Sequence, residues 1–135
     1  MAIPTSGAGY QVGDGNVNEL QLGSAAAPQT ATSTATLTVA QITGGWLKAD
    51  PSTSAATYTL PTATALDSTL SNAHTGSTFD LSIINVGTSS GTVTLSMGTG
   101  ITDGGNAAVA VAITSSATFR FRKTGDAAWT VYKIA

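Results

Sequence analysis

The chain has 135 residues, of which 9% are charged, and its formal net charge is −2 at pH 7. Ala, Gly, Ser and Thr make up 75 of these residues. This composition excludes a long helical protein, which would need many Leu, Glu, Lys and Arg side chains. Because 41% of the residues are hydrophobic, it also excludes charge-driven disorder. There is no basic excess to bind phosphates, so we expect no nucleic-acid partner.

Two further absences narrow the class of protein. The chain contains no cysteine, so it has no disulphide, zinc-thiolate site or cysteine nucleophile. The N-terminus does not have the pattern of a secretory signal, and no apolar run reaches the length of a membrane-spanning helix. We therefore expect a protein that is made in a reducing cytoplasm and has no membrane partner.

The first 33 residues keep neither the helical nor the strand period and are interrupted by Gly and Pro. They nevertheless carry more large apolar side chains than a spacer needs: Ile3, Tyr10, Val12, Leu20 and Leu22. We predict that residues 1–33 form an extended arm that becomes ordered against a partner through these five side chains. A flexible tail is the alternative.

From residue 34 onward, apolar and small polar residues alternate with the period of a strand. This pattern predicts short strands at 34–39, from Trp46 to the Asp50-Pro51 turn, and at 57–60. Residues 62–72 carry apolar side chains at spacings of three and four, which predicts the one short helix of the chain, with Thr62 as its N-cap.

Alternation in the second half of the sequence predicts five more strands, at 79–84, 92–97, 109–113, 118–122 and 129–134. Turns are expected at 87–91, 103–106 and 123–126. The side chains expected to form the core are Phe79, Leu81, Ile83, Phe119 and Phe121.

Residues 34–135 therefore predict an all-β domain, an antiparallel β-sandwich or jelly roll of about eight strands. An up-and-down barrel has a similar pattern. The solvent faces carry Thr and Ala rather than Lys and Glu, so the sheet edges lack the charges that usually protect them. This favours an oligomer, which we expect to be a homotrimer.

The motifs that could carry catalysis fail on their context. Residues 87–91 match G-x-S-x-G, but a strand follows them where a nucleophile elbow requires a helix. The single histidine, His74, lies in a predicted loop, and one His without Cys does not make a transition-metal site. We therefore expect no enzyme activity, no cofactor and no metal site.

The only cluster of basic residues is on the strand at 118–122. Arg120 and Arg122 share one face of this strand, opposite Phe119 and Phe121. Two readings remain open: a polar contact to a partner, or the solvated face of an edge strand.

A series of motifs runs from Tyr58 to Tyr132. They are a strand that ends in Pro, a long core strand that ends in Asn, a Gly-rich turn and a closing aromatic strand: Tyr58-Thr59-Leu60-Pro61, Gly76 to Asn85, Val93-Thr94-Leu95 with Gly98-Thr99-Gly100, and Phe119-Arg120-Phe121-Arg122 before Trp129-Thr130-Val131-Tyr132. This stretch resembles a domain of small virion structural proteins of tailed phages, particularly cyanophage-like ones. The resemblance implies a capsid decoration or cement protein, often a trimer, or a small fibre or spike domain, and brings no catalytic residues.

Composition and resemblance lead to the same expectation. A decoration protein needs a rigid β core, a surface with little charge and an arm. We therefore expect a homotrimer on the capsid surface of the virion that binds the major capsid protein. The alternative is a small tail-fibre, spike or adhesin-type domain that binds carbohydrate, which would require aromatic side chains exposed in a groove.

Overall fold

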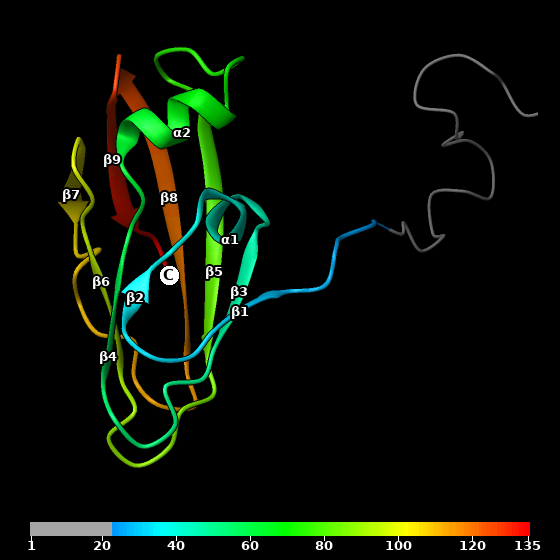
Figure 1. Ribbon diagram of the computed structural model, residues 1–135, viewed down its shortest axis with the longest axis vertical. Coiled ribbons are helices and arrows are strands. Elements are labelled where there is room, and N and C mark those ends of the chain that lie inside the picture. Colours follow the sequence, from blue (N-terminus) through cyan, green and yellow to red (C-terminus); the bar gives the residue numbers. More distant parts are fainter. Residues whose placement is uncertain (1–22) are drawn as a thin grey trace, which may run out of the picture.

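The computed structural model describes residues 23–135, and this part of the chain is rich in β structure (Figure 1). It contains nine strands and two short helices. In chain order they are β1 (Gln29–Ala31), β2 (Ala35–Thr36), α1 (Val39–Thr43), β3 (Trp46–Ala49), β4 (Ala56–Thr59), α2 (Ala63–Thr69), β5 (Thr78–Asn85), β6 (Val93–Ser96), β7 (Ile101–Gly105), β8 (Ser116–Gly125) and β9 (Ala128–Lys133).

The strands form two sheets. One has six strands in the order β1-β3-β5-β8-β9-β7, and the other has three in the order β2-β4-β6. From β1 to β6 the chain alternates between the sheets, and each new strand pairs in parallel with the previous strand of its own sheet. This part of the chain therefore winds in coils, each of which adds one strand to each sheet.

The expectation of an antiparallel domain is wrong for most of these pairs. Only β5 with β8 and β8 with β9 run antiparallel, whereas the other five pairs, β7 with β9 among them, are parallel. Alternating hydrophobicity identifies the buried face of a strand, but it carries no information about strand direction. A parallel pair requires a long connection, which the strand of the opposite sheet provides here.

The helix α1 was not predicted. Residues 34–39 show strand alternation, yet β2 ends at Thr36 and the chain turns into a helix at Val39. Thr38 and Gln41 form a capping box: the Gln41 backbone N–H donates to Thr38 Oγ1 at 3.2 Å, and the Thr38 N–H donates to Gln41 Oε1 at 2.8 Å. The predicted helix is confirmed as α2, with the Ala65 N–H donating to the N-cap Thr62 at 3.1 Å.

The region after β6 also differs from prediction. Residues 101–105 form β7 where a turn was expected at 103–106, and the predicted strand at 109–113 is reduced to a single bridge between Val111 and Val93. The Asp103 carboxylate accepts the backbone N–H groups of Gly105, Ala107 and Ala108, which lowers the pKa of this side chain. These bonds fold the chain back directly after β7.

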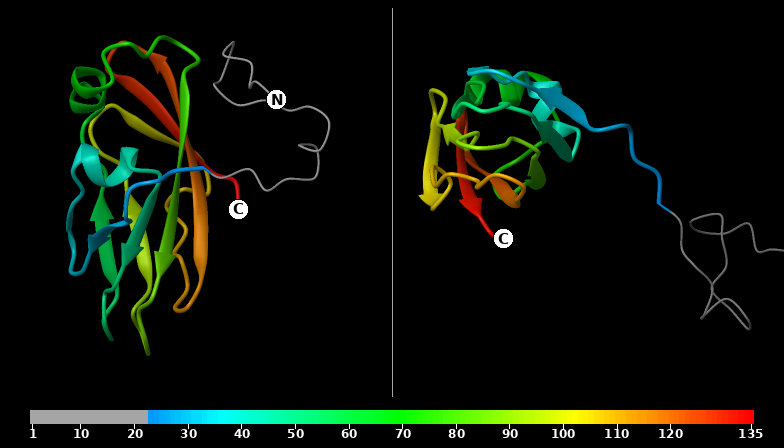
Figure 2. Two further views of the ribbon diagram at one scale, coloured as in Figure 1. Left: turned by 90° about the vertical axis from the view of Figure 1, so that its right-hand side faces the viewer. Right: turned by 90° about the horizontal axis from the view of Figure 1, so that it is seen from below.

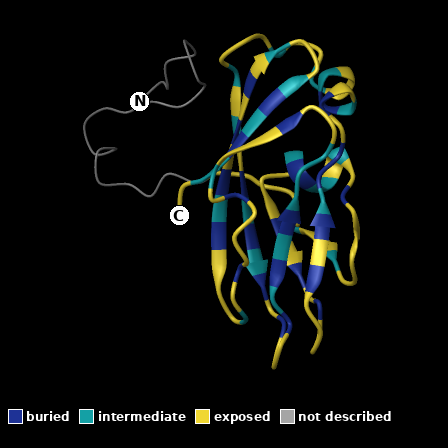
Figure 3. Ribbon diagram, turned by 90° about the vertical axis from the view of Figure 1, so that its left-hand side faces the viewer, coloured by how far each residue is buried: buried dark blue, intermediate teal, exposed yellow. Residues whose placement is uncertain are grey.

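The core contains the side chains that alternation assigned to it, and Figure 3 shows buried and exposed residues alternating along the strands. Leu81, Ile83, Phe119 and Phe121 are fully buried, as predicted. Phe79 is partly buried and stacks on Phe121, with 4.6 Å between the ring centroids. Inward-facing residues of both sheets belong to this one cluster.

A buried amide at the end of β5 joins the loops at one end of the molecule. Asn85 Nδ2 donates to the carbonyls of Gly91, Val111 and Ala112 at 2.9–3.1 Å, and its Oδ1 accepts the Gly87 N–H at 2.8 Å. Because buried polar groups are costly unless paired, this asparagine holds three separate loop segments in one arrangement.

Candidate functional site

The predicted basic residues lie on the outward side of the six-stranded sheet. Along β8, Phe119 and Phe121 are buried whereas Arg120 and Arg122 are exposed, so the prediction of opposite faces is confirmed. β8 lies between β5 and β9, so the alternative that these arginines occupy an edge strand is wrong. Both arginines project from the middle of a broad sheet.

We call this side of the sheet the outer face. β3 and β5 are neighbouring strands, and their register places Lys48 opposite Ile84 and Trp46 opposite Ser82. Its residues on β3, β5, β8 and β9 are Trp46, Lys48, Thr78, Asp80, Ser82, Ile84, Ser116, Thr118, Arg120, Arg122, Thr130 and Tyr132. The sequence did not single out Lys48, because only the parallel pairing of β3 with β5 places it beside the strand that neighbours β8.

One ion pair organises the charge of the outer face. Arg120 donates to Asp80 through Nε at 2.8 Å and Nη2 at 3.0 Å, which lowers the pKa of Asp80 and raises that of Arg120. Both side chains are about half exposed, so the pair orients the guanidinium rather than stabilising the fold. Within residues 23–135, neither Lys48 nor Arg122 forms an ion pair. The outer face is therefore positive, with three cations and one carboxylate.

A hollow continues the outer face past the end of β5. It has a volume of about 480 Å³ and is lined by Ile84, Asn85 and Val86 on one side and by residues 114–116 on the other. Thr114 has φ +53°, an uncommon conformation for a β-branched residue. A hollow lined by both apolar and hydroxyl-bearing residues thus lies next to Lys48, which is opposite Ile84.

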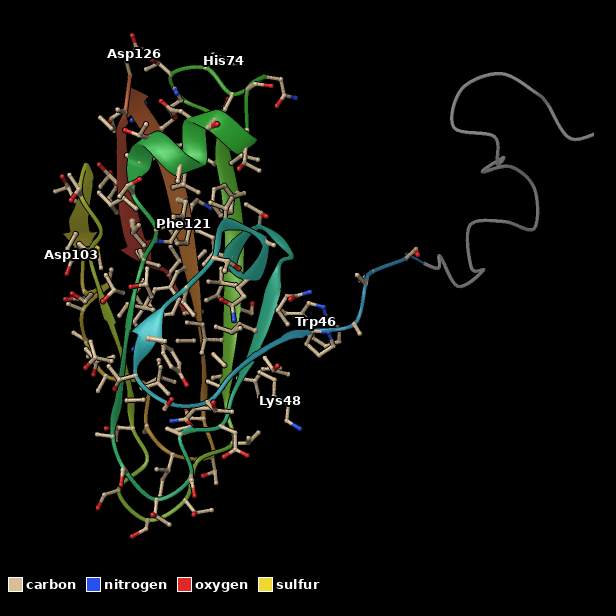
Figure 4. The ribbon with its side chains drawn as sticks, viewed as in Figure 1. Trp46, Lys48, His74, Asp103, Phe121 and Asp126 are labelled. Carbon is tan, nitrogen blue, oxygen red and sulfur yellow. The ribbon has the colours of Figure 1, made fainter. Side chains whose placement is uncertain are left out.

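The chain enters the domain beside the same face. Trp46 and Lys48 project from β3 on the side where the chain approaches β1 (Figure 4), and Trp46 Nε1 donates to the Ala26 carbonyl at 2.9 Å. β1 belongs to the six-stranded sheet, so the predicted arm boundary after residue 33 is too late. The five predicted arm contacts, Ile3, Tyr10, Val12, Leu20 and Leu22, lie outside the described residues.

A second charged cluster is internal. Lys123 is 7% exposed and its Nζ contacts Asp67 Oδ1, while Trp129 Nε1 and the Ala127 N–H donate to the same carboxylate at 2.8 and 2.7 Å. Hydrogen bonds from Lys123, Trp129 and Ala127 lower the pKa of Asp67 to about 2. The cluster joins α2 to β8 and to the turn before β9. Sequence analysis did not predict it because Asp67 lies far along the chain from its three partners.

The remaining candidates are not brought together. The G-x-S-x-G segment, residues 87–91, is a loop between β5 and β6, as expected, and His74 is exposed in the loop before β5. The full length of β5 separates Ser89 from His74. Within residues 23–135, no three His, Asp or Glu side chains meet in a cluster that could hold a metal ion. Neither helix of this part is long and apolar enough to cross a membrane.

Comparison with protein-family models, with curated proteins and with solved structures found no match for the chain. We therefore infer its function from the outer face, the course of the chain beside it and the motifs of residues 58–132.

Proposed function

We propose that this chain is a virion structural protein, a trimeric capsid decoration (cement) protein that binds the major capsid protein and stabilises a phage head. The protein acts by contact area and not by catalysis. The observation that carries the proposal is the outer face, a broad and positively charged sheet surface beside which the chain enters the domain.

The outer face has the dimensions of a protein interface. Its strands contain between 3 and 10 residues each. At ~3.4 Å per residue and ~4.8 Å between strands, the six strands cover roughly 600 Å². A stable interface buries about 800 Å² on each partner, so this face with its adjoining hollow supplies an area of the right order. The exposed Trp46, one of its members, suits a surface that is covered in the assembly.

The edges of the sheets support a homotrimer. We take the two sheets to be a β-sandwich in which β1 and β2 are open edges. These edge strands, Gln29–Ala31 and Ala35–Thr36, carry no charge and no Pro, which are the features that normally block pairing with other chains. Contacts between copies in a closed ring of three would cover these two edges.

One observation favours a second function. Trp46 is 36% exposed, and an exposed indole is a platform on which a sugar ring stacks. A tail-fibre, spike or adhesin-type domain that binds carbohydrate would use it. The larger share of the aromatic surface, from Tyr58, Phe119, Phe121 and Trp129, is buried in the core and does not extend such a platform.

Removal of the segment before the described domain tests the proposal. The truncation should remove residues 2–22, because a longer deletion would remove Ala26, which accepts the Trp46 indole N–H, or would damage β1. We expect the shortened protein to melt as the intact protein does and to bind shells that have been stripped of this chain much more weakly. Avidity from three arms makes this loss large. The measurement is co-sedimentation with shells, in parallel with thermal unfolding.

If the shortened protein decorated shells as tightly as the intact one, the segment would be only a tail. The contact with the shell would then have to lie on the domain itself. Reversing the charge of Arg122 in both the intact and the shortened protein provides the matched comparison, because this side chain is exposed and makes no ion pair among residues 23–135.

A further inference from the structure

We propose that the domain carries a binding pocket for one neutral sugar ring, between the end of α1, the loop after α2 and the start of β5. The inference goes beyond the proposed function and does not depend on it, because such a pocket suits a decoration protein and a fibre domain equally. Its aromatic residue, Phe79, belongs to the inward side of the six-stranded sheet, whereas Trp46 belongs to the outer face. The pocket is therefore a different site from the exposed indole.

The short length of β3 leaves a notch in the sheet. β5 begins at Thr78, but its parallel neighbour β3 begins only opposite Ser82. Residues 78–81 of β5 therefore have β8 on one side and no strand on the other. Figure 2 shows that β5 extends past the start of β3. The end of α1 and the loop after α2 border the open side, and a pocket of about 270 Å³ lies between them and β5.

The pocket offers one face of an aromatic ring. Phe79 lines the pocket and lies opposite Phe121 on β8, with 4.6 Å between the ring centroids and 7° between the ring planes. This distance is close to the spacing of neighbouring strands, so the two rings stack across the sheet. Phe121 covers one face of Phe79, and the other face is turned toward the side that β3 does not reach. Trp129 also lines the pocket and meets Phe79 edge-on.

The other side chains around the pocket bring hydrogen-bonding groups without charge. Thr43 ends α1, Asn72 follows α2 and Ser77 precedes β5, while Leu70 and Ala73 add apolar surface. None of the lining residues is charged, so the pocket does not suit a phosphate or a carboxylate, which Arg and Lys usually bind. A sugar ring has an apolar C–H face that packs on an aromatic ring and hydroxyl groups that pair with amides and hydroxyls.

The backbone of β5 adds further hydrogen-bonding groups on the open side. Ser82 donates its N–H to the Gly45 carbonyl at 3.0 Å, on the side of β3. Backbone groups point to alternate sides along a strand, so those of Thr78 and Asp80 point the same way as those of Ser82. β3 does not extend to these two residues, and their N–H and C=O groups can therefore pair with ligand hydroxyls.

The volume of the pocket limits the size of the ligand. Pockets for small molecules usually measure roughly 300–1,000 Å³, so a pocket of about 270 Å³ accepts one sugar ring and not a long oligosaccharide. One ring on one aromatic face binds weakly, and we expect a dissociation constant of the order of millimolar. Several copies of the chain in one particle would strengthen attachment to a surface that displays many such sugars.

Saturation-transfer difference NMR tests the pocket, because it detects ligands that bind with millimolar affinity. The probes are the methyl glycosides of glucose, galactose, mannose and N-acetylglucosamine. N-acetylphenylalanine amide is the aromatic probe that contains no sugar. Nitrogen-15 spectra of the same samples follow the side-chain amide of Asn72 and the indole N–H of Trp129, both of which belong to lining residues.

Four variants locate the bound sugar. Phe79→Leu removes the ring and keeps an apolar side chain, and Asn72→Ala removes one amide from an exposed position. Ser71→Ala is the matched control, since Ser71 is exposed in the same loop and does not line the pocket. Trp46→Ala tests binding on the exposed indole of the outer face. Thermal unfolding checks each variant, and the exposed Asn72 keeps the test decisive if Phe79→Leu is unfolded.

We expect at least one glycoside to receive saturation and to shift both nitrogen-15 signals. Phe79→Leu should weaken its binding about fivefold or more and Asn72→Ala about threefold, whereas Ser71→Ala and Trp46→Ala should leave it unchanged. No binding of any glycoside at about 50 mM would overturn the proposal. Binding that Trp46→Ala alone abolishes would also overturn it. Binding of the aromatic probe alone would do so as well, because the pocket would then receive a side chain of a partner protein.

Discussion

Replacing Phe121 by alanine is expected to lower the free energy of unfolding by about 3–5 kcal/mol. Phe121 is fully buried in β8, stacks on Phe79 and lies opposite Val131 of β9. Its removal would leave a cavity between these neighbours, and a large cavity in a close-packed core is filled only in part by relaxation. Such a loss is a large share of the stability of a domain of this size.

Urea unfolding followed by tryptophan fluorescence measures this change, because Trp129 packs edge-on against Phe79, 5.6 Å away, in the same cluster. Val109→Ala is the control, since Val109 is 51% exposed and its truncation should have almost no effect. An unchanged midpoint for Phe121→Ala would mean that the faces of β8 are assigned the wrong way round. The assignment of Arg120 and Arg122 to the outer face would then be lost as well.

Replacing Asp67 by alanine is expected to destabilise the protein by about 3 kcal/mol. The substitution leaves the buried Lys123 ammonium, the Trp129 indole N–H and the Ala127 N–H without their common acceptor. Removing one partner of a buried ion pair costs this much because the other charge remains desolvated. The matched control is Asp80→Ala, which breaks an exposed ion pair and should cost no more than about 1 kcal/mol.

The same carboxylate should dominate the acid sensitivity of the fold. The pKa of Asp67 is about 2 in the folded protein, against an ordinary value of 3.8 in the unfolded chain. The folded state therefore binds this proton more weakly, so the stabilisation is complete above about pH 4 and is lost as the pH falls toward 2. The shift corresponds to about 2 kcal/mol. In Asp67→Ala this part of the pH dependence of the unfolding free energy should disappear, whereas in Asp80→Ala it should remain.

Local patterns in the sequence predicted the buried faces of individual strands and one of the two helices of the described residues. Alternation identified the buried faces of β5 and β8, and Thr62 with the spacing of Ala63 and Leu66 identified α2. The capping pair Thr38 and Gln41 was present in the sequence but lay at the end of a strand-like alternation, which hid α1.

Features that depend on distant segments were not predictable in this way. The parallel pairing of β3 with β5 brings Lys48 beside Ile84, and no pattern within either strand encodes that direction. Lys123 resembles a surface residue in sequence, next to Arg122, yet its partner Asp67 comes from a helix in the first half of the chain. The outer face as a whole is therefore a property of the topology, and of its residues only Arg120 and Arg122 were proposed as a contact site beforehand.

The copy number of this chain in purified virions tests the decoration role most directly. Quantitative mass spectrometry of the particles would compare this chain with the major shell protein. If the protein covers the head as a trimer, its copy number should be of the same order as that of the shell subunit, and an image of the particle should show it spread over the whole surface. A copy number far below that of the shell subunit, with the protein confined to the tail or its fibres, would contradict a decoration protein.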